Sequence, residues 1–473
     1  MEPTLWEHQD KAVDGLRMAL RNGYRRPALV MPTGSGKTYV FVFIAHRLSL
    51  KGKKVCIIVH RSYLLDQVSQ ALSKFGVGHG IIAPGHLKTG DNIQVASIDT
   101  LIKRFDQYLH FDLLIFDECH HVIGKNKWAK AIGYYNCYCM GVTATFSRTN
   151  GAGLGVKAGG YFDYLVQGPQ ILDITPEFLA PVRVFTPKNS IDSSVFSRKR
   201  VAGDFDPKEV ESVVNRKVIY GNVPYTYANT CPDIPAIAFC HSINHAQNVA
   251  IRFKECGIPA TYITGKCSKK RRESVMAGYE QGIYKILCSC DLISEGFDVP
   301  FCGAVIKLRP TESLLVEMQQ NGRCMRVKDG KECAFIIDHV NNIKQRHGMP
   351  DMNRVWSLEG TKKNVERSRS LITCPQCCRT QYATAKCIHC GFEFATLKKK
   401  RKGLTTDEAA VLEEMKTEYQ KKEERKKKMY EMMEDAVTLK DYHKIAKELG
   451  YSAGWAWHVW NVRINQKKKV KKL

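Results

Sequence analysis

The stretch Met31-Pro-Thr-Gly-Ser-Gly-Lys-Thr38 carries the strongest structural signal in this chain. It follows a short apolar run, Pro27 to Met31, and opens a segment with the pattern of a helix. Glycines at these positions let backbone N–H groups close around phosphate oxygens, the lysine neutralises the β and γ phosphates, and the threonine hydroxyl is a ligand for Mg²⁺. We therefore predict a loop that binds the phosphates of a nucleotide. Its residues are Thr33, Gly34, Ser35, Gly36, Lys37 and Thr38.

Two acids, Asp117 and Glu118, end a second apolar run further along the chain, Leu113 to Phe116. Acids at the end of a buried strand lie at the carboxyl edge of a parallel sheet, where the phosphate loop also lies. There Asp117 can hold Mg²⁺ through water, and Glu118 can activate the water that attacks the γ-phosphate. Such a pair is otherwise usually a solvated turn, but Lys37 upstream favours the catalytic interpretation.

Apolar runs of strand length alternate with amphipathic stretches on both sides of these motifs. One series extends from residue 27 to about 145, and a second extends from near Val182 to Asp338. This alternation predicts two α/β lobes, each with a parallel sheet. Glycines and prolines are frequent between Gly151 and Pro187, so we place the hinge in or just after that region.

The order of the motifs resembles that of the DEAD/DEAH-like helicases of superfamily 2. Asp117-Glu-Cys-His120 is similar to their D-E-x-H box, with Cys119 in place of the usual alanine. Six further segments resemble the other conserved motifs of this family, in the same order along the chain: Val59–Gln67, Val95–Leu101, Thr143–Thr145, Ala238–Ser242, Asp291–Pro300 and Gln319–Arg326. The last box begins Gln-Gln rather than His-Arg, a form most similar to the branch of restriction translocases and phage-encoded DNA helicases. The resemblance covers about residues 5–340.

The resemblance implies two tandem RecA-like lobes that use ATP and Mg²⁺ to move along nucleic acid. It implies that Gln9 recognises adenine, that Asp298 lies on the nucleotide side, and that Thr143 and Thr145 couple the phosphate state to lobe movement. Two arginine fingers, Arg323 and Arg326, would reach the γ-phosphate from the second lobe. The expected nucleic-acid contacts are Arg61, Thr100 and His241.

The overall composition agrees with a nucleic-acid partner. The 473 residues, 44% of them hydrophobic, are enough for about three domains. A net charge of +25 favours a polyanionic partner. We find no run of about 18 apolar residues that could span a membrane, and the first ten residues lack a secretory signal. We therefore expect a cytoplasmic protein without a membrane partner, in a bacterial or phage-infected host cell.

Four cysteines near the C-terminus have the spacing of a zinc site. They form two C-x₂-C pairs separated by nine residues: Cys374, Cys377, Cys387 and Cys390. Two thiolate knuckles at this spacing can close a tetrahedral Zn²⁺ site, whereas the remaining cysteines are scattered as single thiols. Four thiolates leave no open coordination position, so the zinc would be structural.

The C-terminal tail is basic and rich in aromatic residues. Residues 398–473 contain 21 Lys and Arg against 12 Asp and Glu, a net charge of +9. Trp455 and Trp457 lie near lysines and could stack on bases. The alternative is a small helical hairpin in which the tryptophans form the core.

We therefore expect an α/β protein of two RecA-like lobes with a C-terminal zinc ribbon and a basic α-helical tail. The expected boundaries are 1–180 for lobe 1, 181–345 for lobe 2, 346–372 for a linker, 373–397 for the zinc-binding module and 398–473 for the tail. The expected activity is that of an ATP-dependent DNA helicase or duplex translocase acting on forked or branched DNA, alongside phage or host replication or recombination proteins. Two alternatives remain: an RNA helicase, and a translocase subunit that works with a separate nuclease.

The zinc site gives a first testable prediction. The purified chain should contain one Zn²⁺, measured by atomic emission, and Cys390→Ser should lose it. Because so short a segment has little core of its own, loss of the metal should unfold the module while basal ATP hydrolysis survives. A full zinc complement in Cys390→Ser would contradict this ligand set.

Overall fold

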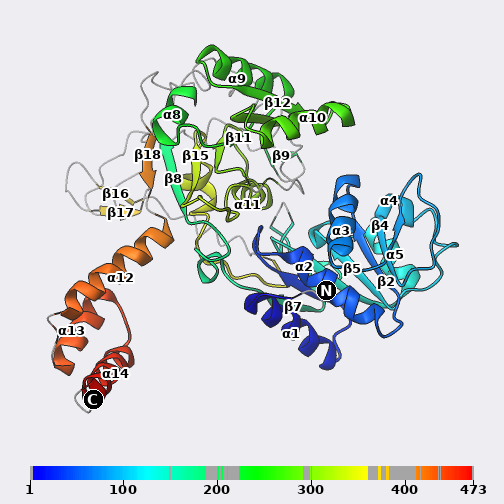
Figure 1. Cartoon of the computed structure of the whole chain (residues 1–473). Helices are drawn as coiled ribbons and strands as arrows, with labels where there is room; N and C mark the ends of the chain where they lie inside the picture. Colours follow the sequence, from blue (N-terminus) through cyan, green and yellow to red (C-terminus); the bar gives the residue numbers. More distant parts are fainter. Residues whose placement is uncertain are drawn as a thin grey trace. The chain divides into compact units, whose positions relative to one another are not determined.

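A computed structural model describes most of the chain. The described residues are 4–148, 151–187, 200, 201, 204, 205, 210, 223–290, 299, 301–360, 371–373, 380–382, 412–415, 417–434, 436 and 438–470. They form two compact units, Met1–Met415 and Lys416–Leu473. Figure 1 traces the elements in chain order.

The first sheet contains seven parallel strands in the order β3-β4-β2-β5-β6-β1-β7. The strands are β1 Pro27–Val30, β2 Val55–Val59, β3 Gly80–Ile82, β4 Ile93–Ser97, β5 Leu113–Asp117, β6 Tyr138–Thr143 and β7 Tyr164–Gln167. Most strand residues are buried because helices cover both faces of the sheet. One face packs against α1 (Glu7–Arg21), α2 (Lys37–Ser49) and α3 (Ser62–Lys74), and the other packs against α4 (Ile98–Leu101) and α5 (Lys127–Tyr135).

The second sheet also has seven strands, in the order β12-β13-β11-β14-β15-β8-β18. Its strands are β8 Val182–Pro187, β11 Ala236–Phe239, β12 Ala260–Thr264, β13 Ile286–Cys290, β14 Ala304–Lys307, β15 Ala334–Asp338 and β18 Leu412–Met415. All pairs are parallel except β8 with β18. The described helices of this lobe are α8 Val223–Thr230, α9 Ile243–Glu255, α10 Lys269–Glu280 and α11 Leu314–Asn321, followed by a π-helical turn at Ile343–His347. The prediction of two α/β lobes with parallel sheets is confirmed.

Two edge strands differ from what the sequence suggested. The strand β7 lies in the Gly- and Pro-rich stretch where we expected a hinge, and it extends the first sheet beside β1. Strand β18 lies within residues that we expected to be helical, and it pairs antiparallel with β8. Both strands are four residues long, and neither shows the period-two pattern on which strand prediction depends. The chain passes from the first sheet to the second between Gln167 and Val182.

A segment beyond the second sheet returns to the first lobe. Trp356 is buried in the core beneath α4 and α5 of lobe 1. The backbone N–H of Gly153 donates to the carbonyl oxygen of Glu359 at 3.1 Å, and that of Gly155 donates to Leu358 at 2.8 Å. Residues 349–360, which we call the return strap, therefore complete the core of a lobe whose other elements precede residue 180.

The C-terminal unit consists of three described helices, α12 (Glu418–Glu434), α13 (Leu439–Leu449) and α14 (Ala453–Val470). Tyr442, Ile445 and Ala456 are buried in a small core between them. Helix α13 ends at Gly450, whose φ of 68° is the left-handed conformation typical of a glycine that closes a helix. This unit packs around its own apolar residues.

Two further antiparallel pairs are described, β9 (Arg200–Val201) with β10 (Asp204–Phe205) and β16 (Leu371–Thr373) with β17 (Thr380–Tyr382). The described cysteines are free thiols. None of the described helices has the length and apolar character needed to cross a membrane.

The return strap can be tested by replacing its buried tryptophan. Trp356→Ala should lower the free energy of unfolding by about 3 kcal/mol, because it removes a large buried side chain and leaves a cavity. Circular dichroism during urea unfolding measures the change. The control is Val355→Ala, since Val355 is 83% exposed in the same segment and should have little effect. Equal stability of the two variants would show that Trp356 is not part of the lobe 1 core.

Candidate nucleotide-binding and hydrolysis site

The predicted phosphate loop lies between β1 and α2, at the carboxyl edge of the first sheet. Gly34 and Gly36 have φ angles of 88° and 84°, a left-handed conformation that strains a residue with a side chain. A Cβ atom at Gly36 would also overlap the side-chain amide of Gln9. The hydroxyl of Ser35 donates to the carbonyl oxygen of Pro32 at 2.7 Å. Glycine at both positions allows the loop to curl tightly.

Lys37 is the first residue of α2, and its side chain folds back over the loop. Its Nζ atom donates to the carbonyl oxygens of Met31 and Pro32 at 3.3 and 3.1 Å. Burial lowers the pKa of Lys37, and the nearby carboxylates of Glu118 and Asp117 oppose this shift. A partly buried ammonium beside a loop of this shape fits the β and γ phosphates of ATP.

The two acids lie at the end of β5. Asp117 is buried, and its Oδ1 atom accepts a hydrogen bond from the backbone N–H of Glu118 at 3.0 Å. Burial and the charge of Glu118 raise the pKa of Asp117 to about 6. Burial also opposes ionisation of Glu118, but the hydrogen bond and charge of His120 bring its pKa down to about 2. Glu118 has a φ of 51°, an uncommon conformation that is often found at functional sites.

The acid pair fits a divalent cation on chemical grounds. Burial and the charge of Glu118 disfavour ionisation of Asp117, and a bound cation would favour it. A carboxylate from Asp117 and a hydroxyl from Thr38 are hard oxygen ligands of the type that Mg²⁺ prefers. Bound Mg²⁺ would neutralise charge on the phosphate oxygens. Glu118 then remains as the candidate base that orients and deprotonates water.

The hydroxyl of Thr143 connects the acid pair to the next strand. Its fully buried oxygen lies 3.1 Å from Nδ1 of His120 and 3.4 Å from Oε2 of Glu118. It also accepts a hydrogen bond from the backbone N–H of Thr145 at 3.3 Å. A displacement of Thr145 would therefore reach Glu118 through two hydrogen bonds, which supports the predicted coupling role of both threonines. His120 also belongs to this network. Its position as the last residue of the D-E-x-H box is the feature of the sequence from which this role could have been predicted.

Gln9 lies beside the loop together with aromatic rings. Its Nε2 atom donates to the carbonyl oxygen of Ser35 at 3.3 Å, and its Oε1 atom accepts from the backbone N–H of Trp6 at 3.0 Å. The ring centroid of Phe178 lies 4.6 Å from that of Trp6 and 4.7 Å from that of His8. Aromatic faces next to a side-chain amide fit a purine base. Phe178 was missed in the sequence because it is distant from Trp6 in the chain and belongs to no motif.

Arg323 and Arg326 follow α11 in the second lobe. Arg323 is 5% exposed, and burial lowers the pKa of Arg326 to about 10. Both guanidinium groups are close enough to Lys37 to lower its pKa. Gly322 packs against the side chain of Thr33 so closely that a Cβ atom would overlap it. The two predicted arginine fingers therefore lie with the phosphate loop.

The three expected nucleic-acid contacts follow the carboxyl ends of strands. Arg61 follows β2 and precedes α3, buried Thr100 lies in α4 after β4, and His241 follows β11. Burial lowers the pKa of His241 to about 4, so its ring is neutral near pH 7. A neutral imidazole can donate and accept hydrogen bonds.

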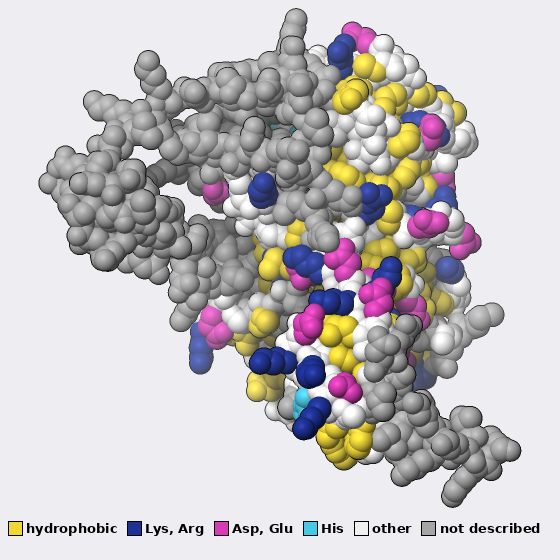
Figure 2. All heavy atoms as spheres, turned by 90° about the vertical axis from the view of Figure 1, so that its left-hand side faces the viewer, with side chains coloured by type: hydrophobic (Ala, Val, Ile, Leu, Met, Phe, Trp, Pro, Cys, Tyr) yellow, Lys and Arg dark blue, Asp and Glu magenta, His cyan; other side chains and the backbone are white. Residues whose placement is uncertain are grey.

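The two candidate tryptophans of the tail differ in exposure. Trp455 stacks on Tyr451 with ring centroids 4.6 Å apart and packs against the core of the C-terminal helices, whereas Trp457 is 55% exposed. Lys421 and Lys428 form ion pairs with Glu418 and Glu448. Lys and Arg side chains also lie among Asp and Glu side chains on the face shown in Figure 2. Of the two tryptophans, Trp457 is the more available for stacking on a base.

Some predicted ligands lie outside the described residues. They are Asp298 and the zinc-site cysteines Cys374, Cys377, Cys387 and Cys390. Within the described part of the chain, no group of three or more His, Cys, Asp or Glu side chains could hold a metal ion. The zinc site and the role of Asp298 stay predictions from the sequence.

Comparisons with known protein families match both lobes. Residues 2–148 match the family described as Type III restriction enzyme, res subunit, and residues 227–328 match the Helicase conserved C-terminal domain. The first match contains the phosphate loop, the acid pair and Thr143. The second contains both arginines.

Individual relatives include a phage protein of similar length. The 51.5 kDa protein of Lactococcus phage (isolate 7-9) is 30% identical over 445 residues, which are 90% of this chain and 92% of that protein. The putative ATP-dependent helicase IRC3 of Saccharomyces cerevisiae is 26% identical over 366 residues, 72% of this chain but only 52% of the yeast protein. Among solved structures, a fragment of a putative HsdR subunit of a type I restriction enzyme from Vibrio vulnificus YJ016 has a similar fold. Its TM-score is 0.57 at 21% identity, covering 72% of this chain and 64% of that one.

Two substitutions test the assigned roles of the lysine and the glutamate. Glu118→Gln should retain ATP binding but lose hydrolysis by about 10² to 10⁴-fold, because it removes the base and leaves the loop intact. Lys37→Ala should weaken ATP binding, since it removes the charge that compensates the phosphates. Binding of a fluorescent ATP analogue and steady-state phosphate release separate the two effects. Near-normal turnover in Glu118→Gln would remove that residue from the chemistry.

Proposed function

The chain belongs to superfamily 2 of the helicases as an ATP hydrolase, and we propose that it is a DNA translocase that remodels forked or branched duplexes. One observation carries the proposal: the phosphate loop, the acid pair and Thr143 of the first lobe lie with Arg323 and Arg326 of the second. Hydrolysis that requires groups from two lobes can be coupled to movement between them.

In this proposal each group of side chains has a separate task. Lys37 and the backbone of the loop bind the phosphates, and Gln9 with Trp6 and Phe178 binds the base. Asp117 holds the cation, and Glu118 activates water. The arginines stabilise the charge that develops on the transferred phosphoryl group.

Two observations favour DNA over RNA as the substrate. The first lobe matches a family named for restriction enzymes, whose substrate is DNA. The Gln-Gln form of the last box is most similar to the same branch. A nuclease motif is not evident in the sequence, so a restriction-type role would require a partner that cuts DNA.

The C-terminal region would add affinity for the nucleic acid. We assign Cys374, Cys377, Cys387 and Cys390 to a structural zinc module on the basis of their spacing. The unit from residue 416 to the end carries 16 Lys and Arg against 8 Asp and Glu, a net charge of +8. Such a charge binds polyanions by releasing counterions. Trp457 would provide a stacking surface.

The substrate is tested by nucleic-acid stimulation of ATP hydrolysis and by strand displacement. Forked DNA, four-way DNA, linear duplex DNA and an RNA fork of the same sequence should be compared at one salt concentration. We expect stimulation and displacement on DNA, greatest for branched substrates, and none with Lys37→Ala. Equal or greater activity on RNA would identify an RNA helicase. ATP hydrolysis without displacement of any strand would favour a translocase subunit.

A truncation tests the proposed contribution of the tail. Deletion of residues 416–473 keeps β18 in the second sheet, so ATP hydrolysis should persist. DNA affinity should fall and its dependence on salt should become less steep, because fewer phosphates are neutralised. Fluorescence anisotropy at several salt concentrations measures both quantities. An unchanged affinity and slope would contradict a DNA-binding role for the tail.

A further inference from the structure

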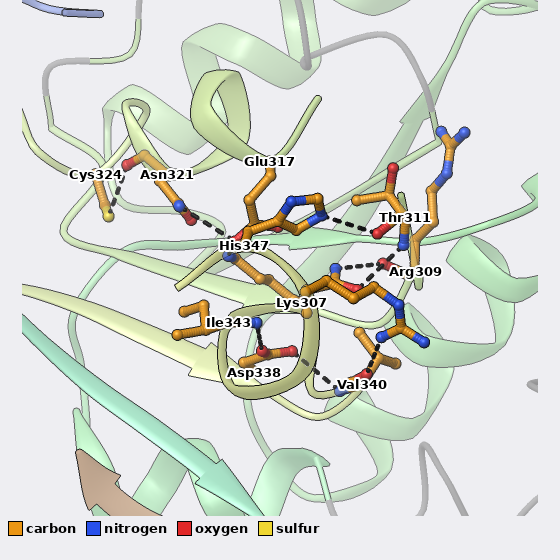
Figure 3. Close-up of polar contacts among 12 residues, drawn as sticks. Lys307, Arg309, Thr311, Glu317, Asn321, Cys324, Asp338, Val340, Ile343 and His347 are labelled. Atoms are coloured by element: carbon orange, nitrogen blue, oxygen red, sulfur yellow. Dashed lines mark hydrogen bonds and ion pairs between the residues drawn. The ribbon is translucent and has the colours of Figure 1, made fainter. Parts of the chain in front are cut away.

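The helix that leads to the two arginines is attached to the second sheet by a buried ion pair. Lys307, the last residue of β14, is 0% exposed, and its Nζ atom contacts Oε1 of Glu317 on α11. Figure 3 shows the two side chains meeting in the interior of the lobe. Because β14 is paired on both sides, by β11 and β15, Lys307 has a rigid base.

The ion pair extends toward the arginines along one face of α11. Asn321, one turn after Glu317, donates from Nδ2 to the same Oε1 atom at 3.2 Å. Asn321 ends the helix, and Gly322 and Arg323 follow directly. The carbonyl oxygen of Asn321 in turn accepts from the thiol of Cys324 at 3.3 Å. One carboxylate oxygen therefore links the sheet, the helix and the start of the arginine loop.

A second lysine holds the other end of that loop. The Nζ atom of Lys331 donates to the carbonyl oxygens of Cys302 at 2.9 Å and of Arg326 at 2.8 Å, and it also contacts the carbonyl oxygen of Cys324. An ammonium has three N–H groups, and three carbonyl oxygens surround this one. The backbone on both sides of Arg326 is thus held by Lys331.

Stability alone does not explain a buried ion pair at this position. Burial of two charges costs solvation energy, and well-packed apolar residues of similar volume are often as stable or more stable. Here the cost is increased by Asp338, a second buried carboxylate that lies beside Lys307 in the sheet. Burial raises the pKa of Asp338, while the charge of Lys307 opposes the shift. An ion pair differs from apolar contact in fixing the position and orientation of its partners.

We propose that Lys307, Glu317 and Lys331 are positioning residues that hold Arg323 and Arg326 in the orientation that ATP hydrolysis requires. This inference rests on the role proposed above for the two arginines. The three residues do not touch the nucleotide. They act by fixing α11 and the loop after it, which Gly322 brings against Thr33 of the phosphate loop.

The test replaces the ion pair by apolar side chains of similar size. Lys307→Met combined with Glu317→Leu removes both charges of the pair together, so the variant should fold with at most a small fall in melting temperature. Asp338 loses the cation beside it but keeps its hydrogen bonds from the backbone N–H groups of Val340 and Ile343. Affinity for a fluorescent ATP analogue should be unchanged. The turnover number at saturating ATP should fall about a hundredfold, since a small misplacement of catalytic groups is enough for such a loss. A purely structural role predicts normal turnover in this folded variant, and that result would overturn the proposal.

Two further variants complete the experiment. Lys331→Met removes the donor to the loop carbonyls and should lower turnover without loss of ATP affinity. If the double variant does not fold, Lys331→Met serves as the test of the positioning role. Normal turnover in Lys331→Met would overturn the proposal. The control is Lys269→Met with Glu273→Leu, which removes an exposed ion pair of the same lobe and should leave turnover unchanged.

Arg326→Ala separates this proposal from the proposed function. Loss of turnover in Arg326→Ala with normal turnover in the positioning variants would reject only the positioning role. Normal turnover in Arg326→Ala would reject the role of the arginine itself, and the positioning inference with it.

Discussion

The backbone N–H of Met31 donates a hydrogen bond to the carbonyl oxygen of Thr143 at 3.0 Å, and the geometry of the site depends on this junction. It joins the start of the phosphate loop to the end of β6. On the other side of β6 lies β5, which ends in Asp117. The strand order β5-β6-β1 thus brings three parts of the site to one edge of the sheet. The phosphate loop, the acid pair and Thr143 can therefore be short motifs, because the paired strands hold them in position relative to one another.

Cationic side chains from both lobes gather at this edge. Lys37, Arg323 and Arg326 lie close enough that the arginines disfavour the charge on Lys37. A polyphosphate would attract all three cations, so the bound nucleotide can act as an electrostatic link between groups from two sheets. Release of a charged product would weaken the same link. The arrangement offers a physical basis for a motor that alternates between a tighter and a looser state.

The sequence predicted those features that depend on short-range pattern. Lys37, Asp117 and Thr143 were found because each follows an apolar strand and belongs to a compact motif, and both parallel sheets followed from the alternation of runs. Contacts between distant positions left no such pattern. Phe178 contacts Trp6, which is distant in the chain, Lys307 pairs with Glu317 on the next helix, and Lys331 binds backbone carbonyl oxygens; none of these contacts forms a motif in the sequence. Strand β7 was missed because its four residues lie in a Gly- and Pro-rich stretch, where propensity favours loops.

The return strap has a consequence for biosynthesis. A chain grows from its N-terminus, and domains generally begin to fold as they emerge from the ribosome. Lobe 1 here lacks a piece of its core until Trp356 has been made, after the entire second sheet apart from its edge strand β18. The core of the first lobe therefore cannot be completed before the second lobe has been synthesised. Lobe 1 is thus translated first, but its core can be completed only after most of lobe 2 has been made. The nucleotide site between the phosphate loop and the arginines is therefore completed late in synthesis.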